Sequence, residues 1–384
     1  MRITHVCLTG PVTDGWNYQD NLLPKYQVKN GHDVTMITSK WIWSEEGKKV
    51  YFDKTNYYNE DGVKMIRLEM KGKANFDKKI KSFYNLYETV ESTDPDILFI
   101  HGVSFKDNTV LARFLKKHAS VIAYADNHVD YSNSATNWLS ENILHKVIWK
   151  YYAQKLVPYV KYFYGVLPAR VVFLRDVYRI PKEKCKLLIM GADDELVEKS
   201  IIDKARDTVR KQYGIKEDDF LIITGGKIDQ WKPQTLLLMK AINQIDNNRL
   251  KLIVFGSLAD ELKVEFNNLL SERVTYIGWI ESRKSYDLFS SANLVVFPGR
   301  HSVFWEQVAG QGIPMIVKYW DGTTHIDHGG NVIFLYSDSE KEIVDSIMNL
   351  LNDKKSYLTM MQKAQSVKKD FLYSEIAKQA IEEE

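Results

Sequence analysis

The sequence predicts an α/β protein of two doubly wound domains, each with a parallel sheet between two layers of helices. Three observations lead to this fold class. Short apolar runs alternate with helical stretches along the chain, which is typical of parallel sheets flanked by helices. The chain is 384 residues long, a length that suits about two domains. Its 45% hydrophobic and 27% charged residues are typical of a globular protein.

The first half of the chain holds six predicted strands, each a short apolar run bounded by polar or turn residues. They are expected at 4–9, 33–38, 97–101, 121–124, 171–174 and 186–189. A charged helical stretch follows at 195–213 and ends at Gly214. We therefore expect the first domain to span residues 1–194.

The second half repeats the pattern with six more strands. They are expected at 220–224, 251–255, 274–277, 294–297, 315–317 and 332–335. This second domain is expected to span 195–371, and a last helix follows at 372–384. Because ligands of doubly wound sheets bind at the carboxyl ends of the strands, two such domains predict a substrate cleft between them.

Composition excludes several classes of protein. Only two cysteines, Cys7 and Cys185, argue against a disulfide framework and fit a reducing cytoplasm. No apolar run is long enough to span a bilayer, and residues 1–10 are too short and too soon interrupted for a signal peptide. We expect a cytoplasmic protein with no nucleic-acid partner.

Residues 142–186 are strongly basic and rich in aromatic side chains. They contain ten Lys or Arg residues against two acidic ones, although the net charge of the chain is only +2. On one or two helices, this segment would suit anionic lipid headgroups or a polyanionic acceptor, and peripheral contact with an anionic membrane follows as an expectation. The alternative, equally open, is that the aromatic residues pack a core while the lysines face water.

The stretch 297–317 predicts a nucleotide pocket. A strand at 294–297 stops at a Pro-Gly pair, and Ser302 is placed to cap the helix that follows. A capped helix start presents free backbone N–H groups and a positive dipole end, which suit a diphosphate without a metal ion. Glu306, one turn into the helix, can accept hydrogen bonds from sugar hydroxyls.

This stretch resembles the C-terminal half of retaining glycosyltransferases of the GT-B fold, of the group 1, family 4-like type. Segment 220–233 looks like the Gly-Arg…Lys signature of that family, with Lys227 where arginine is usual and Lys232 where lysine is usual. Further matching segments follow in the expected order at 29–35, 94–101, 275–280 and 286–293. The resemblance therefore covers most of the chain.

The resemblance implies two Rossmann-like domains facing across a cleft, the first binding the acceptor and the second the nucleotide sugar. It also implies a last helix that crosses back to the first domain. The expected reaction moves a sugar from a nucleoside diphosphate, most suitably a UDP-sugar, onto a glycan or lipid-linked acceptor in cell-surface polysaccharide synthesis. We expect retention of configuration and neither a metal ion nor another cofactor.

Two lysines are the predicted catalytic cations. Lys227 and Lys232 lie between a strand ending at Gly226 and a helix beginning with Pro233, so both ammonium groups can converge on the leaving diphosphate. The alternative is that they are ordinary surface lysines of a loop. His128 occupies the position at which related enzymes have a histidine near the transferred sugar. His101 is the competing choice, and either can equally be a structural histidine.

The remaining expected donor-binding positions follow from the resemblance. Trp279 is placed to flank the base, and the loop at 10–15 is similar to the family's glycine-rich loop near the phosphates. The full set is Gly15, Gly226, Trp279, His301, Ser302, Val303 and Glu306.

The chain departs from the family at one position. A second glutamate usually lies eight positions before Glu306, where this sequence has Pro298. Its task can pass to Arg300 or His301, and the donor sugar stays open. Two alternatives remain: a nucleotide-sugar epimerase on the same scaffold, or a nucleotide-sugar-binding or scaffold protein without turnover. No metal site is expected, since Asp94-Pro-Asp96 is typical of a turn and no His/Cys cluster has zinc spacing.

Overall fold

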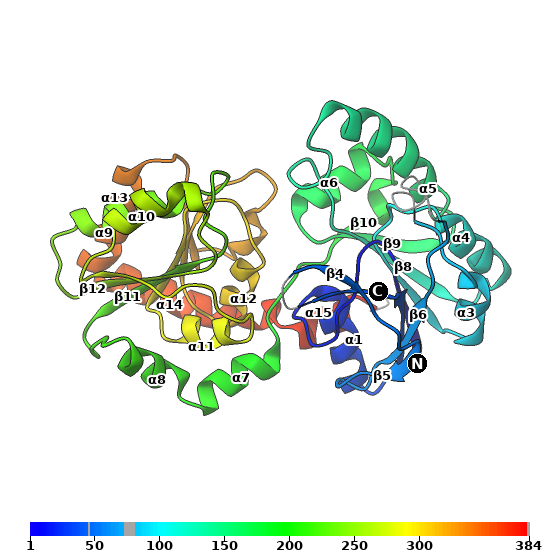
Figure 1. The fold of residues 1–384 in the computed structure, drawn as a ribbon, viewed down its shortest axis with the longest axis horizontal. Coiled ribbons are helices and arrows are strands. Elements are labelled where there is room, and N and C mark those ends of the chain that lie inside the picture. The colour runs from blue at the N-terminus through cyan, green and yellow to red at the C-terminus, as the bar shows by residue number, and fades with distance from the viewer. Residues whose placement is uncertain (45–46, 73–80, 382–384) are drawn as a thin grey trace. The chain divides into compact units, whose positions relative to one another are not determined.

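The computed structural model describes residues 1–44, 47–72 and 81–381 (Figure 1), and the chain divides into two compact units. Unit 1 comprises residues 1–189 and 376–384, and unit 2 comprises 190–375. The helix expected at 372–384 is present as α15 (Tyr373–Gln379), while 382–384 lie outside the described residues. No helix in the described part of the chain is long and apolar enough to cross a membrane.

Unit 1 is built on an eight-stranded sheet in the order β10-β9-β8-β7-β1-β2-β6-β5. Its strands are β1 (Arg2–Cys7), β2 (Asp33–Ser39), β5 (Asn56–Tyr58), β6 (Lys64–Leu68), β7 (Ile97–His101), β8 (Ile122–Asn127), β9 (Val160–Gly165) and β10 (Cys185–Leu187). Neighbouring strands of this sheet run parallel, except that β5 is antiparallel to β6. A separate antiparallel pair joins β3 (Trp41–Trp43) to β4 (Lys49–Tyr51).

Helices connect the strands of unit 1 and cover its sheet. They are α1 (Gln19–Lys29), α3 (Leu86–Ser92), α4 (Asn108–Lys117), a π-helical segment (Ser140–Trp149), α5 (Lys150–Gln154), α6 (Pro168–Asp176) and a short 3₁₀ turn (Lys182–Lys184). Parallel neighbours need such crossovers, which explains the alternation seen in the sequence.

The strand predicted at 171–174 is wrong, because these residues lie in α6. Pro168 occupies the first turn of that helix, where a missing N–H costs nothing. A four-residue apolar run cannot be assigned to strand or helix from its periodicity. The true strand, β9, lies inside the basic segment 142–186, so this segment is helical only in part, at 140–154 and 168–176. The other five predicted strands of the first half are confirmed.

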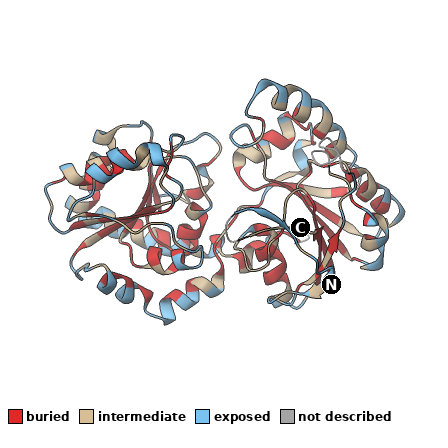
Figure 2. Cartoon of the chain, in the orientation of Figure 1, coloured by how far each residue is buried: buried red, intermediate tan, exposed pale blue. Residues whose placement is uncertain are grey.

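Unit 2 is built on a parallel six-stranded sheet in the order β13-β12-β11-β14-β15-β16. Its strands are β11 (Phe220–Gly225), β12 (Leu250–Phe255), β13 (Val274–Tyr276), β14 (Leu294–Phe297), β15 (Met315–Lys318) and β16 (Val332–Leu335). All six strands predicted for the second half are confirmed. The central positions of β11, β12, β14 and β15 are almost all apolar and buried, as expected for a sheet covered on both faces (Figure 2).

Helices cover both faces of the second sheet, with α9, α10 and α13 on one side and α11, α12 and α14 on the other (Figure 1). The helices of this unit are α7 (Asp194–Ile202), α8 (Ala205–Gln212), α9 (Gln234–Gln244), α10 (Lys263–Asn268), α11 (Lys284–Ser290), α12 (Phe304–Gly310), α13 (Glu340–Asn352) and α14 (Lys354–Val367), with 3₁₀ turns at Asp260–Leu262, Thr324–Ile326 and Lys368–Phe371.

The strand order of each sheet reverses at one point. In unit 1 the reversal lies between β1 and β7, and in unit 2 between β11 and β14. At such a point the connections leave the two neighbouring strands in opposite directions, which opens a crevice beyond their carboxyl ends. The two candidate sites of the chain lie there.

A buried arginine anchors α8 to the loops that precede β11 and β14. The guanidinium of Arg210 donates to the carbonyl oxygens of Lys216, Asp219 and Ser291 at 2.6, 2.7 and 3.1 Å.

We predict that Arg210→Met lowers the free energy of unfolding of unit 2 by about 2–4 kcal/mol, because the three buried carbonyl groups lose the guanidinium as their hydrogen-bond donor. Urea unfolding followed by circular dichroism measures this loss. The control is Lys211→Met on the exposed face of α8, and equal stability of the two variants would contradict the prediction.

Candidate functional site

Three glycines bring two loops of unit 2 into close contact beside β11. A Cβ on Gly225 would lie 2.1 Å from the ring of Phe255, and one on Gly256 would lie 1.8 Å from the carbonyl oxygen of Gly226. Gly226 also has φ +124°, a conformation that other residues rarely adopt. The backbone at the end of β11 therefore carries no side chains, and a ligand could approach its N–H and C=O groups closely.

Cationic side chains gather beyond this bare backbone. Lys227 Nζ lies 2.9 Å from a carboxylate oxygen of Asp229, and the Arg300 guanidinium lies 5.8 Å from the centroid of the Trp231 ring. Burial lowers the pKa of Lys232; the carboxylate of Asp229 opposes this shift, and the charges of Arg300 and Lys227 add to it. Three cations and one carboxylate thus share a small volume, and an anion there would be attracted.

Ser302 does not cap α12 as expected. The N-cap residue is Val303, already in a helical conformation with φ −57° and ψ −14°, and its side chain makes no capping hydrogen bond. The carbonyl oxygen of Ser302 instead accepts from the Trp305 N–H at 3.0 Å. The helix therefore begins one residue later than the hydroxyl would require. A donor-binding role for the backbone at 302 and 303 stays a prediction.

Glu306 is wholly buried between two imidazole rings. Its Oε1 atom accepts from Nε2 of His301 and from Nε2 of His325, each at 2.8 Å. Burial alone would raise the pKa of Glu306, but the two histidines outweigh it and hold that pKa well below its usual range. Oε2 is buried without a hydrogen-bond partner among the described residues. Glu306 thus offers one unpaired acceptor.

His325 was missed by the sequence analysis, because it lies in a short 3₁₀ turn with no local pattern around it. Trp231, exposed beside Arg300, was also missed, although it lies within the signature segment 220–233. Trp279 was predicted; it lies beyond the end of β13 with 68% of its surface exposed, and its contact with a base stays a prediction.

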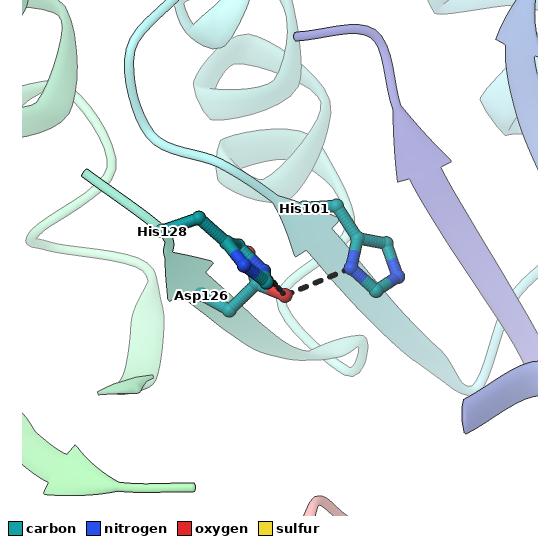
Figure 3. Close-up of side chains that lie close together, drawn as sticks. All are labelled: His101, Asp126 and His128. Carbon is teal, nitrogen blue, oxygen red and sulfur yellow. Dashed lines mark hydrogen bonds and ion pairs between the residues drawn. The ribbon is translucent and has the colours of Figure 1, made fainter. Parts of the chain in front are cut away.

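The second candidate site lies in unit 1, where the two histidines weighed as alternatives meet on one carboxylate (Figure 3). Asp126, at the end of β8, accepts from His101 Nδ1 at 2.8 Å, from the Gly102 N–H at 2.8 Å and from His128 Nε2 at 3.3 Å. Asp126 and His101 are buried, whereas the His128 side chain is 39% exposed. Burial would raise the pKa of Asp126, but the two imidazoles outweigh it and hold that pKa well below its usual range.

The loop at 10–15 leaves the same end of β1. The buried Arg67 side chain donates to the Val12 carbonyl oxygen at 3.1 Å and lies 3.2 Å from the carboxylate of Asp14. Gly15 has φ +74°, which suits a glycine at the turn into α1. The loop is therefore held by the sheet, and a phosphate contact at Gly15 stays a prediction.

Among the residues that the structure describes, two groups of side chains could hold a metal ion. One is His101, Asp126 and His128, and the other is His301, Glu306 and His325. Within each group the candidate ligand atoms lie within 4.8 Å of one another. In both groups the carboxylate already accepts hydrogen bonds from the imidazoles, so neutral or protonated histidines also satisfy the geometry.

Known proteins share the two-unit α/β architecture of this chain. Residues 205–367 match the family described as Glycosyl transferases group 1, whereas no curated protein matches the chain. Sucrose-phosphate synthase from Thermosynechococcus elongatus is similar in structure, with TM-score 0.67 and 16% identity over 98% of this chain and 96% of that one. Anabaena HepE, solved with UDP, gives TM-score 0.66 and 16% identity over 99% and 98% of the chains.

An enzyme of another class shares the fold. The UDP-GlcNAc 2-epimerase of Neisseria meningitidis, bound to UDP-GlcNAc, gives TM-score 0.60 and 14% identity over 98% of each chain. The expected GT-B fold, with two Rossmann-like α/β units, is therefore confirmed. At sequence identities of 14–16%, these similarities establish the fold but not the reaction or the substrate.

The low pKa of Glu306 predicts an acid-dependent loss of stability. A carboxyl group whose pKa is lower in the folded chain stabilises the fold above its ordinary value of 4.5, and this contribution is lost as the pH falls toward the folded value. Between about pH 5 and pH 3, wild type should therefore lose more free energy of unfolding than Glu306→Gln. Urea unfolding at both pH values measures the difference, and parallel losses would contradict the prediction.

Proposed function

We propose that the chain is a glycosyltransferase that transfers a sugar from UDP to a glycan or lipid-linked acceptor, because residues 205–367 match the family Glycosyl transferases group 1 and the chain has the GT-B fold. The reaction retains the configuration of the sugar, and side chains supply the positive charge without a metal ion or other cofactor. Similar structures support the choice of base, since HepE was solved with UDP and with UDP-glucose. Cell-surface polysaccharide synthesis is the pathway we infer.

One observation carries this proposal: the cations at the end of β11. Burial lowers the pKa of Lys232, the nearby charges of Arg300 and Lys227 lower it further, and Asp229 is the counter-charge. As the bond between sugar and phosphate breaks, negative charge accumulates on the leaving diphosphate. Preorganised cations bind that charge more tightly in the transition state than in the substrate, which accelerates the reaction.

Glu306 holds the ribose in this proposal. Its Oε2 atom is the unpaired acceptor, and a buried carboxylate oxygen is stabilised when it gains a donor. His301, which already contacts Glu306, takes the place of the glutamate that Pro298 replaces and binds the diphosphate or the donor sugar. The neighbouring backbone at 302 and 303, together with Gly226 and Trp279, completes the donor site.

Unit 1 binds the acceptor, with Gly15 and His128 on the side of the transferred sugar. The acceptor oxygen attacks the anomeric carbon on the face from which the diphosphate leaves. The bond from that carbon to the phosphate oxygen breaks, its electron pair stays on the diphosphate, and the same oxygen takes the acceptor proton. This course gives retention, whereas attack on the opposite face would give inversion.

The epimerase alternative has a specific support, because UDP-GlcNAc 2-epimerases share the fold. An epimerase converts a UDP-sugar without an acceptor. A binding protein without turnover would hold UDP but neither transfer nor release sugar. Incubation with UDP-sugars, followed by NMR of the sugar products, separates the three: a new glycosidic bond, an isomeric UDP-sugar, or unchanged donor.

We predict that UDP stabilises the full chain, by about 2.7 kcal/mol at a hundredfold excess over its Kd. Lys232→Ala should remove most of this effect and all transfer, because the diphosphate loses its most buried cation. The measurement is a thermal shift titration with UDP. Parallel titrations with GDP, ADP and CMP show which base the site prefers. Lys354→Ala, an exposed lysine at the start of α14, is the matched control. Equal UDP shifts in wild type and Lys232→Ala would exclude this donor site.

A membrane surface in unit 1 is the last part of the proposal. Along the π-helical segment and its neighbours, large apolar side chains are exposed at intervals of four residues: Leu139 at 63%, Ile143 at 42%, Val147 at 58% and Tyr151 at 54%. Trp138 belongs to the same surface and is 71% exposed, and Lys146, Lys150 and Lys155 flank this surface. Apolar side chains flanked by lysines favour the interface of an anionic membrane.

We predict that the protein binds vesicles containing phosphatidylserine more tightly than neutral vesicles. The double variant Lys150→Glu with Lys155→Glu should weaken this binding at least about tenfold, since each lysine near an anionic surface contributes about 1 kcal/mol. Vesicle co-sedimentation measures it, with Lys354→Glu and Lys355→Glu in unit 2 as the control pair. Equal binding to phosphatidylserine-containing and neutral vesicles would contradict the prediction.

A further inference from the structure

A pocket in unit 2 lies away from both candidate sites. It has a volume of about 290 Å³, and its walls come from α7, α8, α11, α14 and the loops that precede β14 and β15. Two of its lining residues, Asn293 and Pro314, directly precede these parallel strands, so the pocket lies at their amino ends. Lys227 and Lys232 instead follow the carboxyl end of β11, which runs parallel to β14. The pocket and the proposed donor site therefore lie at opposite ends of the sheet.

Two cations line this pocket, Arg206 and Lys368, and its described lining residues include no carboxylate. Nη1 of Arg206 donates to the carbonyl oxygens of Ser291 and Ala292 at 3.0 and 3.1 Å. Nη1 of Arg210 donates to the same Ser291 oxygen at 3.1 Å, so two guanidinium groups of like charge meet at one acceptor. No described residue forms an ion pair with Arg206 or Lys368. An anion in the pocket would balance this positive charge.

Gln311, directly after α12, adds a hydrogen-bond acceptor that lacks a donor. Its Nε2 atom donates to the carbonyl oxygen of Tyr286 at 2.8 Å, which fixes the orientation of the amide. Its Oε1 atom is buried without a hydrogen-bond partner among the described residues, and the residue as a whole is only 8% exposed. A buried acceptor without a donor is costly, which favours an occupant that can donate. Because Gln311 lines the pocket, a ligand there could supply the missing donor.

Much of the remaining lining is apolar. It includes Val197 and Ile201 of α7, Ile313 and Pro314 before β15, and Met361 of α14. The volume corresponds to about ten water molecules, which suits a ligand well below the size of a nucleotide sugar. A small ligand with an apolar body and one acidic group matches the size, the lining and the charge together.

Hydrogen bonds between separate elements fix the walls of the pocket. Gln365 of α14 donates to the carbonyl oxygen of Gly312 at 2.9 Å, and the hydroxyl group of Tyr357 donates to that of Asn293 at 3.0 Å. Gly312 has φ +71°, and a Cβ at this position would lie 2.8 Å from Nε2 of Gln365. α14 is therefore held against both loops, and a preformed pocket loses little entropy when a ligand binds.

We propose that this pocket is a binding site for a small organic anion. The acidic group of the ligand, a carboxylate or a phosphate monoester, lies against Arg206 and Lys368. Its apolar body contacts Ile313 and Met361, and one hydroxyl or N–H group donates to Oε1 of Gln311. The site uses none of the donor-site residues, so the proposal is independent of the transferase reaction.

Binding is tested by NMR of the full chain with ¹³C-labelled methionine methyl groups. Hexanoate and hexyl phosphate are the probes, and they distinguish a carboxylate site from a phosphate site. The signal of Met361, assigned through Met361→Leu, should shift and saturate with at least one of them, whereas that of Met239, buried in α9, should not. Hexanol and hexylammonium have the same apolar body without the negative charge, and both should bind about tenfold more weakly.

The contact with Gln311 is tested with hexanoates that carry one hydroxyl group at different carbons. At least one of them should bind about fivefold more tightly than hexanoate, because its hydroxyl donates to the unpaired Oε1 atom. If none of them gains affinity, Gln311 is not part of the site.

Two adjacent isoleucines provide a matched pair of variants. Ile201 lines the pocket and is 64% exposed, whereas Ile202 is 69% exposed and is not among the lining residues. Ile201→Glu places a negative charge beside the bound anion and should weaken its binding about fivefold, while Ile202→Glu should leave it unchanged. If Ile201→Glu fails to fold, Lys368→Gln is the second variant and should also weaken binding about fivefold, with the exposed Lys355 changed to Gln as its control.

Four results would overturn the anion site. The first is a Met361 signal that does not respond to either probe, and the second is equally tight binding of hexylammonium. The third is an equal loss of affinity in Ile201→Glu and Ile202→Glu. The fourth is loss of binding in Lys232→Ala, because the probe would then occupy the proposed donor site instead of this pocket.

Discussion

Each candidate site depends on one buried carboxylate that is stabilised by two imidazole rings. A carboxylate removed from water is costly unless donors surround it, and Asp126 in unit 1 and Glu306 in unit 2 both meet this condition with histidines. The histidines are fixed in turn, because an ionised partner accepts only N–H groups. Side chains that reach the surface, such as His128, thereby acquire a defined orientation and tautomer.

The sheets decide where these carboxylates lie. In both units the strand order reverses once, and the loops beyond the two adjacent strands carry the polar side chains. The bare backbone at Gly225 and Gly226 lies at one reversal, and His101 lies at the other. Apolar strands buried on both faces supply the rigid platform, while the loops supply the chemistry.

Much of the fold could be predicted from local pattern. All six strands of unit 2 and five of the six predicted for unit 1 are present, because a buried strand between turn residues has a local signature. The error at 171–174 came from a run too short to show its period, and β9 was hidden in a segment whose charge and aromatic content suggested helices. The strands β5 and β6 were missed altogether, which left the edge of the first sheet unpredicted.

The sequence by itself determined the α/β class, most strands and the loop in which Lys227 and Lys232 lie together, since each depends on residues close in the chain. Only the tertiary structure decided which histidine meets which carboxylate. His101 reaches Asp126 from a different strand, and His325 lies 19 residues beyond Glu306. These contacts follow from the order of strands in the sheets, and that order arises when distant segments pack together rather than from any local spacing.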